Sequence, residues 1–183
     1  MISFREKANF IWSVADLLRG DYKQSDYGKV ILPLTVLRRL DCLLAPTRAQ
    51  VQEALPKFQD KGEMILDAAL NKLTGFKFHN RSKFDFASLV ADPGYLAANL
   101  RKYISGFSES VRDIVEQFSF EEQIERLDKA DLLYQVVKRF AEIDLTTTDP
   151  MEMGYIFEEL IRKFAEQSNE TAGDHFTPRE SFA

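Results

Sequence analysis

The sequence is poor in the residues that bind metals or form disulfide bonds. Its 183 residues include one cysteine, Cys42, and two histidines, His79 and His175. A single cysteine cannot form an intrachain disulfide, and it excludes a zinc site built from several thiolates. The two histidines are far apart in the sequence, and no cysteine lies close to either. We therefore expect no metal centre and no disulfide.

Phosphate-binding glycine loops and long apolar runs are also missing. The eight glycines are scattered and form neither GxGxxG nor GxxxxGK. No apolar run approaches the about 20 residues that span a bilayer, and residues 1–7 lack the apolar core of a secretory signal. No nucleophile, base and acid form a recognisable arrangement, so residue chemistry predicts no catalytic site. We expect a cytoplasmic protein that does not act on membranes.

A strong positive charge, typical of proteins that bind nucleic acid by themselves, is absent. The net charge is −5 and is spread unevenly. Residues 1–100 contain 14 basic and 11 acidic side chains, whereas residues 101–183 contain 10 basic and 18 acidic ones. Any contact with DNA should therefore come from the first half of the chain.

Helical patterns cover nearly the whole chain. Ser3 and Glu6 form a capping-box pattern, and the apolar residues that follow recur at helical spacing. Asp149 and Pro150 are typical of a helix start. The expected fold is mainly α, a compact domain of about eight helices, with a small hairpin or an irregular loop near residues 76–86. The expected helices are residues 4–18, 29–44, 47–58, 63–73, 92–104, 110–118, 119–141 and 149–166.

One short basic segment is a candidate for DNA contact. Residues 72–83 contain four cations and no acid, and two phenylalanines, Phe76 and Phe78, lie between the cations. The cations could neutralise phosphates, and the aromatic rings could stack on bases. The alternative is a loop that packs on the core while its cations face water. The candidate DNA-binding residues are Lys72, Lys77, Arg81 and Lys83.

The end of the chain differs from the rest in composition. Residues 167–174 are polar and contain glycine, which is typical of a linker. We therefore expect a helical domain over residues 1–166, followed by a linker and the start of a second domain over residues 167–183. Thr177, Pro178 and Glu180 form the pattern of a capped helix start. Residue chemistry alone thus predicts a helical assembly or binding module cut from a longer chain.

Several segments resemble a known family. Residues 9–20 (NFIWSVADLLRG) and 27–41 (YGKVILPLTVLRRLD) resemble the helical N-terminal domain of the M (modification) subunit of type I restriction-modification systems. Residues 153–161 are also similar. Residues 173–179 resemble the family's G-x-[FYH]-[FY]-T-P-R element. The M subunits of this family are N6-adenine DNA methyltransferases.

The resemblance implies a cofactor, partners and a division of labour. It implies S-adenosyl-L-methionine as the methyl donor of the parent enzyme. It implies a complex with a specificity (S) subunit, which reads the DNA sequence, a second M subunit, a restriction (R) subunit and double-stranded DNA. The helical domain would help to clamp the DNA while the catalytic domain flips out an adenine. The residues implied to lie against the cofactor are Asp174, His175, Phe176, Thr177, Pro178 and Arg179.

The family's catalytic elements are missing from the sequence. Neither Asp-Pro-x-x-Gly-x-Gly nor Asn-Pro-Pro followed by an aromatic residue occurs. We therefore expect this chain to be inactive by itself and the parent chain to be the methyltransferase. Two alternatives stay open at this stage: a docking module of another complex without enzymatic activity, and a free-standing helical DNA-binding protein.

Overall fold

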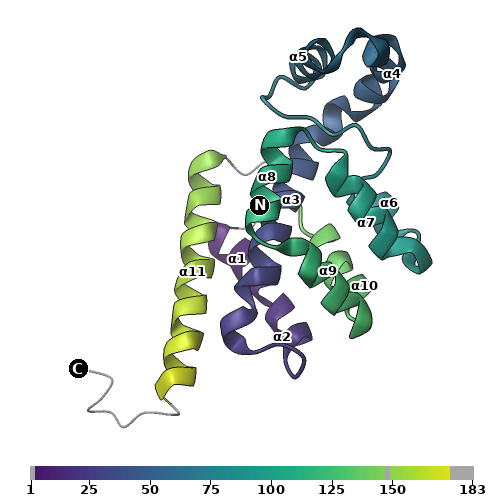
Figure 1. Cartoon of the computed structure of the whole chain (residues 1–183). Coiled ribbons are helices and arrows are strands. Elements are labelled where there is room, and N and C mark those ends of the chain that lie inside the picture. The colour runs from purple at the N-terminus through teal and green to yellow at the C-terminus, as the bar shows by residue number, and fades with distance from the viewer. Residues whose placement is uncertain (1–2, 147–148, 174–183) are drawn as a thin grey trace.

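The computed structural model describes residues 3–146 and 149–173, and this part of the chain is helical almost throughout (Figure 1). The expectation of a mainly α, multi-helix fold is confirmed. No strand occurs among the described residues, and residues 75–85 form an irregular segment instead of a hairpin. The helices are α1 Phe4–Trp12, α2 Val14–Leu18, α3 Gly28–Leu44, α4 Arg48–Phe58, α5 Glu63–Thr74, α6 Phe86–Val90, α7 Leu96–Ser105, α8 Glu109–Gln117, α9 Phe120–Lys129, α10 Leu133–Ala141 and α11 Pro150–Gly173.

Two helices begin at the caps that the sequence predicts. The Ser3 hydroxyl accepts a hydrogen bond from the backbone N–H of Glu6 at 3.2 Å at the start of α1. The Asp149 carboxylate accepts one from the N–H of Glu152 at 2.8 Å at the start of α11. Each cap satisfies one of the N–H groups that a helix start leaves without a partner.

Other predicted boundaries are wrong. The helix expected over residues 119–141 is divided into α9 and α10, because Asp131 has a left-handed backbone with φ of 60°. Ser119 also has a positive φ, 52°, and its side chain makes no cap. At the other end of the chain, α11 continues to Gly173 instead of ending near Glu166.

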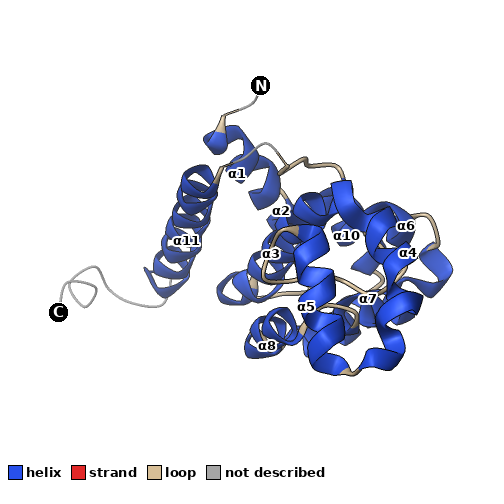
Figure 2. Ribbon diagram, turned by 90° about the horizontal axis from the view of Figure 1, so that it is seen from above, coloured by secondary structure: helices blue, strands red, loops and turns tan. Residues whose placement is uncertain are grey.

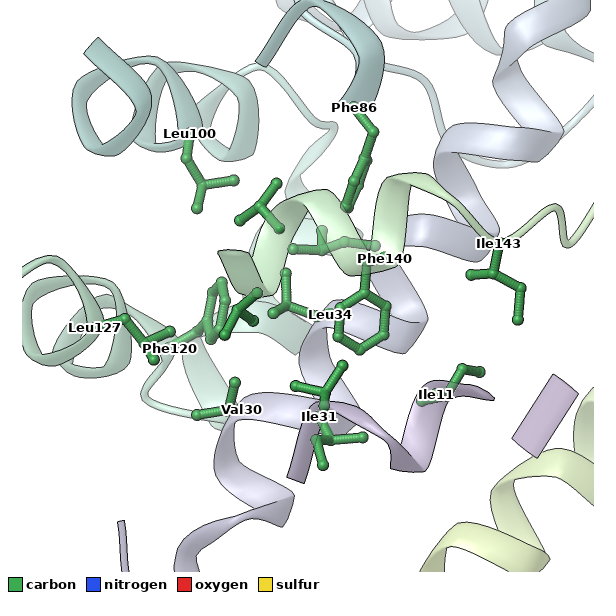
Figure 3. Packing of buried hydrophobic residues seen from close by; sticks show 14 of the residues in the cluster. Ile11, Val30, Ile31, Leu34, Phe86, Leu100, Phe120, Leu127, Phe140 and Ile143 are labelled. Carbon is green, nitrogen blue, oxygen red and sulfur yellow. The ribbon is translucent and has the colours of Figure 1, made fainter. Parts of the chain in front are cut away.

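Helix α3 lies at the centre of the bundle. Val30, Ile31, Leu34 and Leu37 on this helix have no exposed surface. Figure 3 shows the first three of these side chains among those of the surrounding helices, in one continuous apolar core. Burying each such side chain contributes about 1.5–3 kcal/mol to stability. Because α3 buries apolar side chains on several sides, the surrounding helices pack against it.

Helix α11 lies along one side of the bundle (Figure 1). It is held there by ring contacts with α1: Tyr155 lies 5.2 Å from Phe4, and Phe164 lies 5.1 Å from Trp12, between ring centroids. The Phe164 ring also approaches to 3.5 Å from the place where a Cβ of Gly28 would lie. That separation is an ordinary van der Waals contact, so the start of α3 packs directly against α11.

Helices α4 and α5 form an arm at one end of the molecule (Figures 1 and 2). They have a small apolar core of their own, made by Val51, Leu66 and Leu70 and separate from the main core. An arm with its own core keeps its shape while it projects from the bundle.

Candidate functional site

The basic segment that the sequence singles out, residues 72–83, lies where the arm meets the bundle. Its irregular part is fixed by backbone hydrogen bonds to the turn between α7 and α8. The N–H of Arg81 donates to the carbonyl of Gly106 at 2.7 Å, and the N–H of Ser108 donates to the carbonyl of His79 at 3.0 Å. The side-chain amide of Asn80 donates to the carbonyl of Tyr103 at 2.9 Å. The segment is therefore built into the fold.

Gly106 is required for this close approach. A Cβ at this position would lie 2.8 Å from the Asn80 Oδ1 atom and 2.8 Å from both the Cβ and the backbone nitrogen of Ser82. Real Cβ contacts are almost never that short. The two segments can therefore touch only because this residue has no side chain.

His79 is buried at the base of the arm and is neutral. Its side chain has no exposed surface. Its Nε2 atom lies 3.0 Å from Nε of Arg81, which can only donate, so Nε2 accepts. Nδ1 therefore has the proton and donates it to Oδ1 of Asn71 at 2.8 Å. Burial, together with the positive charge of Arg81, lowers the pKa of His79 to about 4.

Arg81, one of the four candidate DNA contacts, is engaged within the protein. Its guanidinium donates to both carboxylate oxygens of Glu63, at 3.0 and 2.7 Å. These bonds lower the pKa of Glu63. A guanidinium in a bidentate pair has few donors left for phosphate. Arg81 therefore holds α5 against the irregular segment.

The other three candidates are exposed. Lys72 lies on α5, and Lys77 and Lys83 lie in the irregular segment. The Lys83 ammonium lies 5.4 Å from the centre of the Phe84 ring. None of the three lysines forms an ion pair with a residue of the described part. The three lysines thus differ from Arg81 in being exposed and without an ion pair in the described part, although the sequence grouped all four as candidate DNA contacts.

Arg38 and Arg39, side by side on α3, hold the connection between α10 and α11. Nε of Arg38 donates to the carbonyl of Ile143 at 2.8 Å, and its NH2 donates to the carbonyl of Ala141 at 3.2 Å. Arg39 donates to the carbonyl of Leu145. The two arginines thus tie the first residues of this connection to α3.

Asp41 is a buried carboxylate that joins α3, α6 and α7. It accepts from the Tyr103 hydroxyl at 2.9 Å, from the backbone N–H of Phe86 at 3.2 Å and from Arg38 at 3.1 Å. Burial raises the pKa of Asp41, and these three donors oppose that change. A buried charge needs such partners. Nothing in the local sequence around Asp41 indicates this network, because its members are far apart along the chain.

The residues that the resemblance assigns to the cofactor, Asp174, His175, Phe176, Thr177, Pro178 and Arg179, lie outside the described residues. Within residues 3–146 and 149–173, no group of three or more His, Cys, Asp or Glu side chains could hold a metal ion. No helix in the described part is long and apolar enough to cross a membrane.

A comparison with protein families identifies the bundle. Residues 7–140 match the model of the HsdM N-terminal domain. The chain belongs to this family. It is the N-terminal domain of the M subunit of type I restriction-modification systems, as the sequence resemblance implied. The match extends from within α1 into α10 and so includes the arm and the basic segment. Neither the curated proteins nor the solved structures contain a match.

The family places the HsdM N-terminal domain in a larger enzyme. M subunits of type I systems are DNA methyltransferase subunits that work in a complex with other subunits. The functional surfaces of this domain should therefore be surfaces of contact.

Proposed function

We propose that this chain is the part of an M subunit that holds the complex together around DNA while the parent enzyme transfers a methyl group. The donor is S-adenosyl-L-methionine and the acceptor is N6 of adenine. The partners are the S subunit, a second M subunit and, in the complete system, the R subunit. The observation that carries the proposal is the match of residues 7–140 to the HsdM N-terminal domain.

The described residues support a role in assembly more than one in chemistry. His79, the histidine of the described part, is neutral and enclosed, and both of its ring nitrogens have partners. Asp41 is buried, and its carboxylate accepts hydrogen bonds from three donors. Groups that are satisfied in this way hold elements together and are not free to exchange protons with a substrate.

Contact with DNA is proposed for the exposed lysines of the irregular segment. Lys77 and Lys83 extend from a segment whose backbone is fixed, so each would meet a phosphate with little loss of backbone freedom. Few phosphate contacts give weak binding with a shallow dependence on salt concentration, because the slope of that dependence grows with the number of phosphates contacted. The domain therefore contributes to a clamp whose main affinity comes from the rest of the complex.

Methylation by the parent chain tests this proposal. The full reading frame is expressed with its S subunit and incubated with labelled S-adenosyl-L-methionine and duplex DNA. We expect label on N6 of adenine, and about tenfold weaker DNA binding at low salt for Lys77→Glu/Lys83→Glu with unchanged assembly. If the parent chain methylated no adenine, the proposed methyltransferase activity would be refuted. If the double variant bound DNA as tightly as the unchanged protein, the proposed role of Lys77 and Lys83 in DNA contact would be refuted.

A further inference from the structure

Both helices of the arm bind the backbone of the irregular segment, residues 75–85. The segment passes the base of the arm between the end of α5 and the start of α6 (Figure 1). It contains Lys77 and Lys83, which are exposed and form no ion pair within the described part of the chain. The contacts that the arm makes with this backbone therefore bear on where the two lysines lie.

Helix α4 binds the end of the segment that contains Lys83. Two of its side chains donate hydrogen bonds to the four successive backbone carbonyls of residues 81–84. Gln52 donates to the first two, at 3.1 and 2.8 Å, and Arg48 donates to the last two, the second of them at 2.6 Å. The two residues are four positions apart, so they lie on the same side of the helix. The backbone on both sides of Lys83 is thereby fixed to α4.

Helix α5 binds the backbone around Lys77 through one hydroxyl group. Thr74 is buried in the last turn of α5. Its Oγ1 atom accepts a hydrogen bond from the N–H of Phe76 at 3.2 Å and donates to the carbonyl of Phe78 at 2.9 Å. These two groups belong to the residues immediately before and after Lys77. One side chain thus holds both neighbours of Lys77.

The side chains that bind the segment are poor candidates for DNA contact themselves. Gln52 and Thr74 are uncharged, and the Arg48 guanidinium lies 3.6 Å from the carboxylate of Asp85, which offsets its charge. An effect of Gln52 or Thr74 on DNA binding would therefore have to act through the backbone. A lysine on a fixed backbone loses less freedom when it meets a phosphate than one on a loose backbone.

We infer that Gln52 and Arg48 are positioning residues for Lys83, and that Thr74 is the positioning residue for Lys77. The inference rests on the proposed contact of these two lysines with DNA. It gives the arm a function in the clamp, because a pair of helices with a core of its own is a firm support for the segment. Since each lysine has a support of its own, loosening one should leave the other in place.

DNA binding by the complex of the full reading frame and its S subunit tests the inference. The dissociation constant for a short duplex is measured at low salt by fluorescence anisotropy. Gln52→Met removes the amide donors and changes no charge. We expect it to weaken binding about threefold, in the otherwise unchanged protein and in Lys77→Ala, by returning freedom to the backbone. It should have no further effect in Lys83→Ala, because the residue it positions has lost its charge.

Thr74→Val tests the other support in the same way. It removes the hydroxyl and keeps a similar shape, and it should weaken binding about threefold except in combination with Lys77→Ala. Thr74→Ser keeps the hydroxyl and should bind DNA like the unchanged protein.

Gln50→Met is the matched control for Gln52→Met. Gln50 lies on the same helix, is exposed and makes no hydrogen bond through its side chain within the described part. The control should leave DNA binding unchanged. Hydrogen exchange at residues 81–84 should be faster in Gln52→Met than in Gln50→Met, and circular dichroism checks that all variants remain folded.

The outcomes separate the inference from the proposed DNA contact. If Lys77→Ala and Lys83→Ala bind DNA as tightly as the unchanged protein, the DNA contact fails and the positioning role fails with it. If the lysine variants weaken binding while Gln52→Met and Thr74→Val do not, the DNA contact stands and the positioning role alone is refuted. Equal losses in every lysine background, or an equal loss with Gln50→Met, would show a general loosening of the fold and would also refute it.

Discussion

The hydrogen bond between Tyr103 and Asp41 allows a quantitative test of the fold. Replacing Tyr103 with phenylalanine removes the hydroxyl and leaves the ring, which packs against Phe86 and Phe107 at centroid distances of 6.0 and 5.1 Å. The carboxylate keeps two donors, Arg38 and the N–H of Phe86. Losing one hydrogen bond to a charged group costs about 1.5–3 kcal/mol. We expect Tyr103→Phe to reduce the free energy of unfolding by that amount.

Removing the carboxylate should cost more. In Asp41→Ala, the Tyr103 hydroxyl and the N–H of Phe86 lose their acceptor, while Arg38 keeps the carbonyls of Ala141 and Ile143. Breaking a buried charge pair by removing one partner costs about 3–5 kcal/mol. Single domains are stable by about 5–15 kcal/mol in total, so this variant should lose a large fraction of its stability.

Urea denaturation followed by circular dichroism measures both effects. The slope of free energy against urea concentration should be unchanged, since the surface exposed on unfolding is the same. Tyr134→Phe is the control, because Tyr134 is 38% exposed and its ring is on the surface. The double variant Asp41→Ala/Tyr103→Phe should cost less than the sum of the two single changes. A Tyr103→Phe effect as small as that of Tyr134→Phe, or strict additivity, would refute this account of the network.

Three further perturbations follow from the same structure. The pKa of His79 is lowered to about 4 in the folded protein from about 6.5 in the unfolded chain. Because protons therefore bind the unfolded state more strongly, the contribution of neutral His79 to stability is complete above pH 6.5 and is lost as the pH falls toward 4. The loss from pH 7 to pH 5 should be about 2 kcal/mol and should be absent from His79→Gln; equal losses in the two proteins would contradict the assignment. Gly106→Ala should destabilise the fold by about 1–3 kcal/mol, whereas Gly94→Ala, where a Cβ meets nothing within 4 Å, should cost far less. Trp12→Ala should speed hydrogen exchange in α11, since its ring lies 5.1 Å from that of Phe164; unchanged exchange would show that other contacts hold the helix.

Local chemistry in the sequence predicted most of the helices. Capping side chains and the 3.6-residue period act within a few residues, so Ser3 and Asp149 mark real helix starts. The same local signals did not predict the break at Asp131, which divides the helix expected over residues 119–141 into α9 and α10. Two residues have a left-handed backbone, Ser119 between α8 and α9 and Asp131 between α9 and α10. A pattern of neighbouring residue types does not specify a left-handed backbone at such a junction.

Contacts between distant parts of the chain could not be predicted. The partners of Arg38 are an example. Its main partners are backbone carbonyls more than 100 positions away, at Ala141 and Ile143. Arg81 was grouped with three lysines because it is basic and close to them in sequence. It differs from them in having Glu63, 18 positions away, as a bidentate partner. Residue type gives the charge, and only the fold gives the partner.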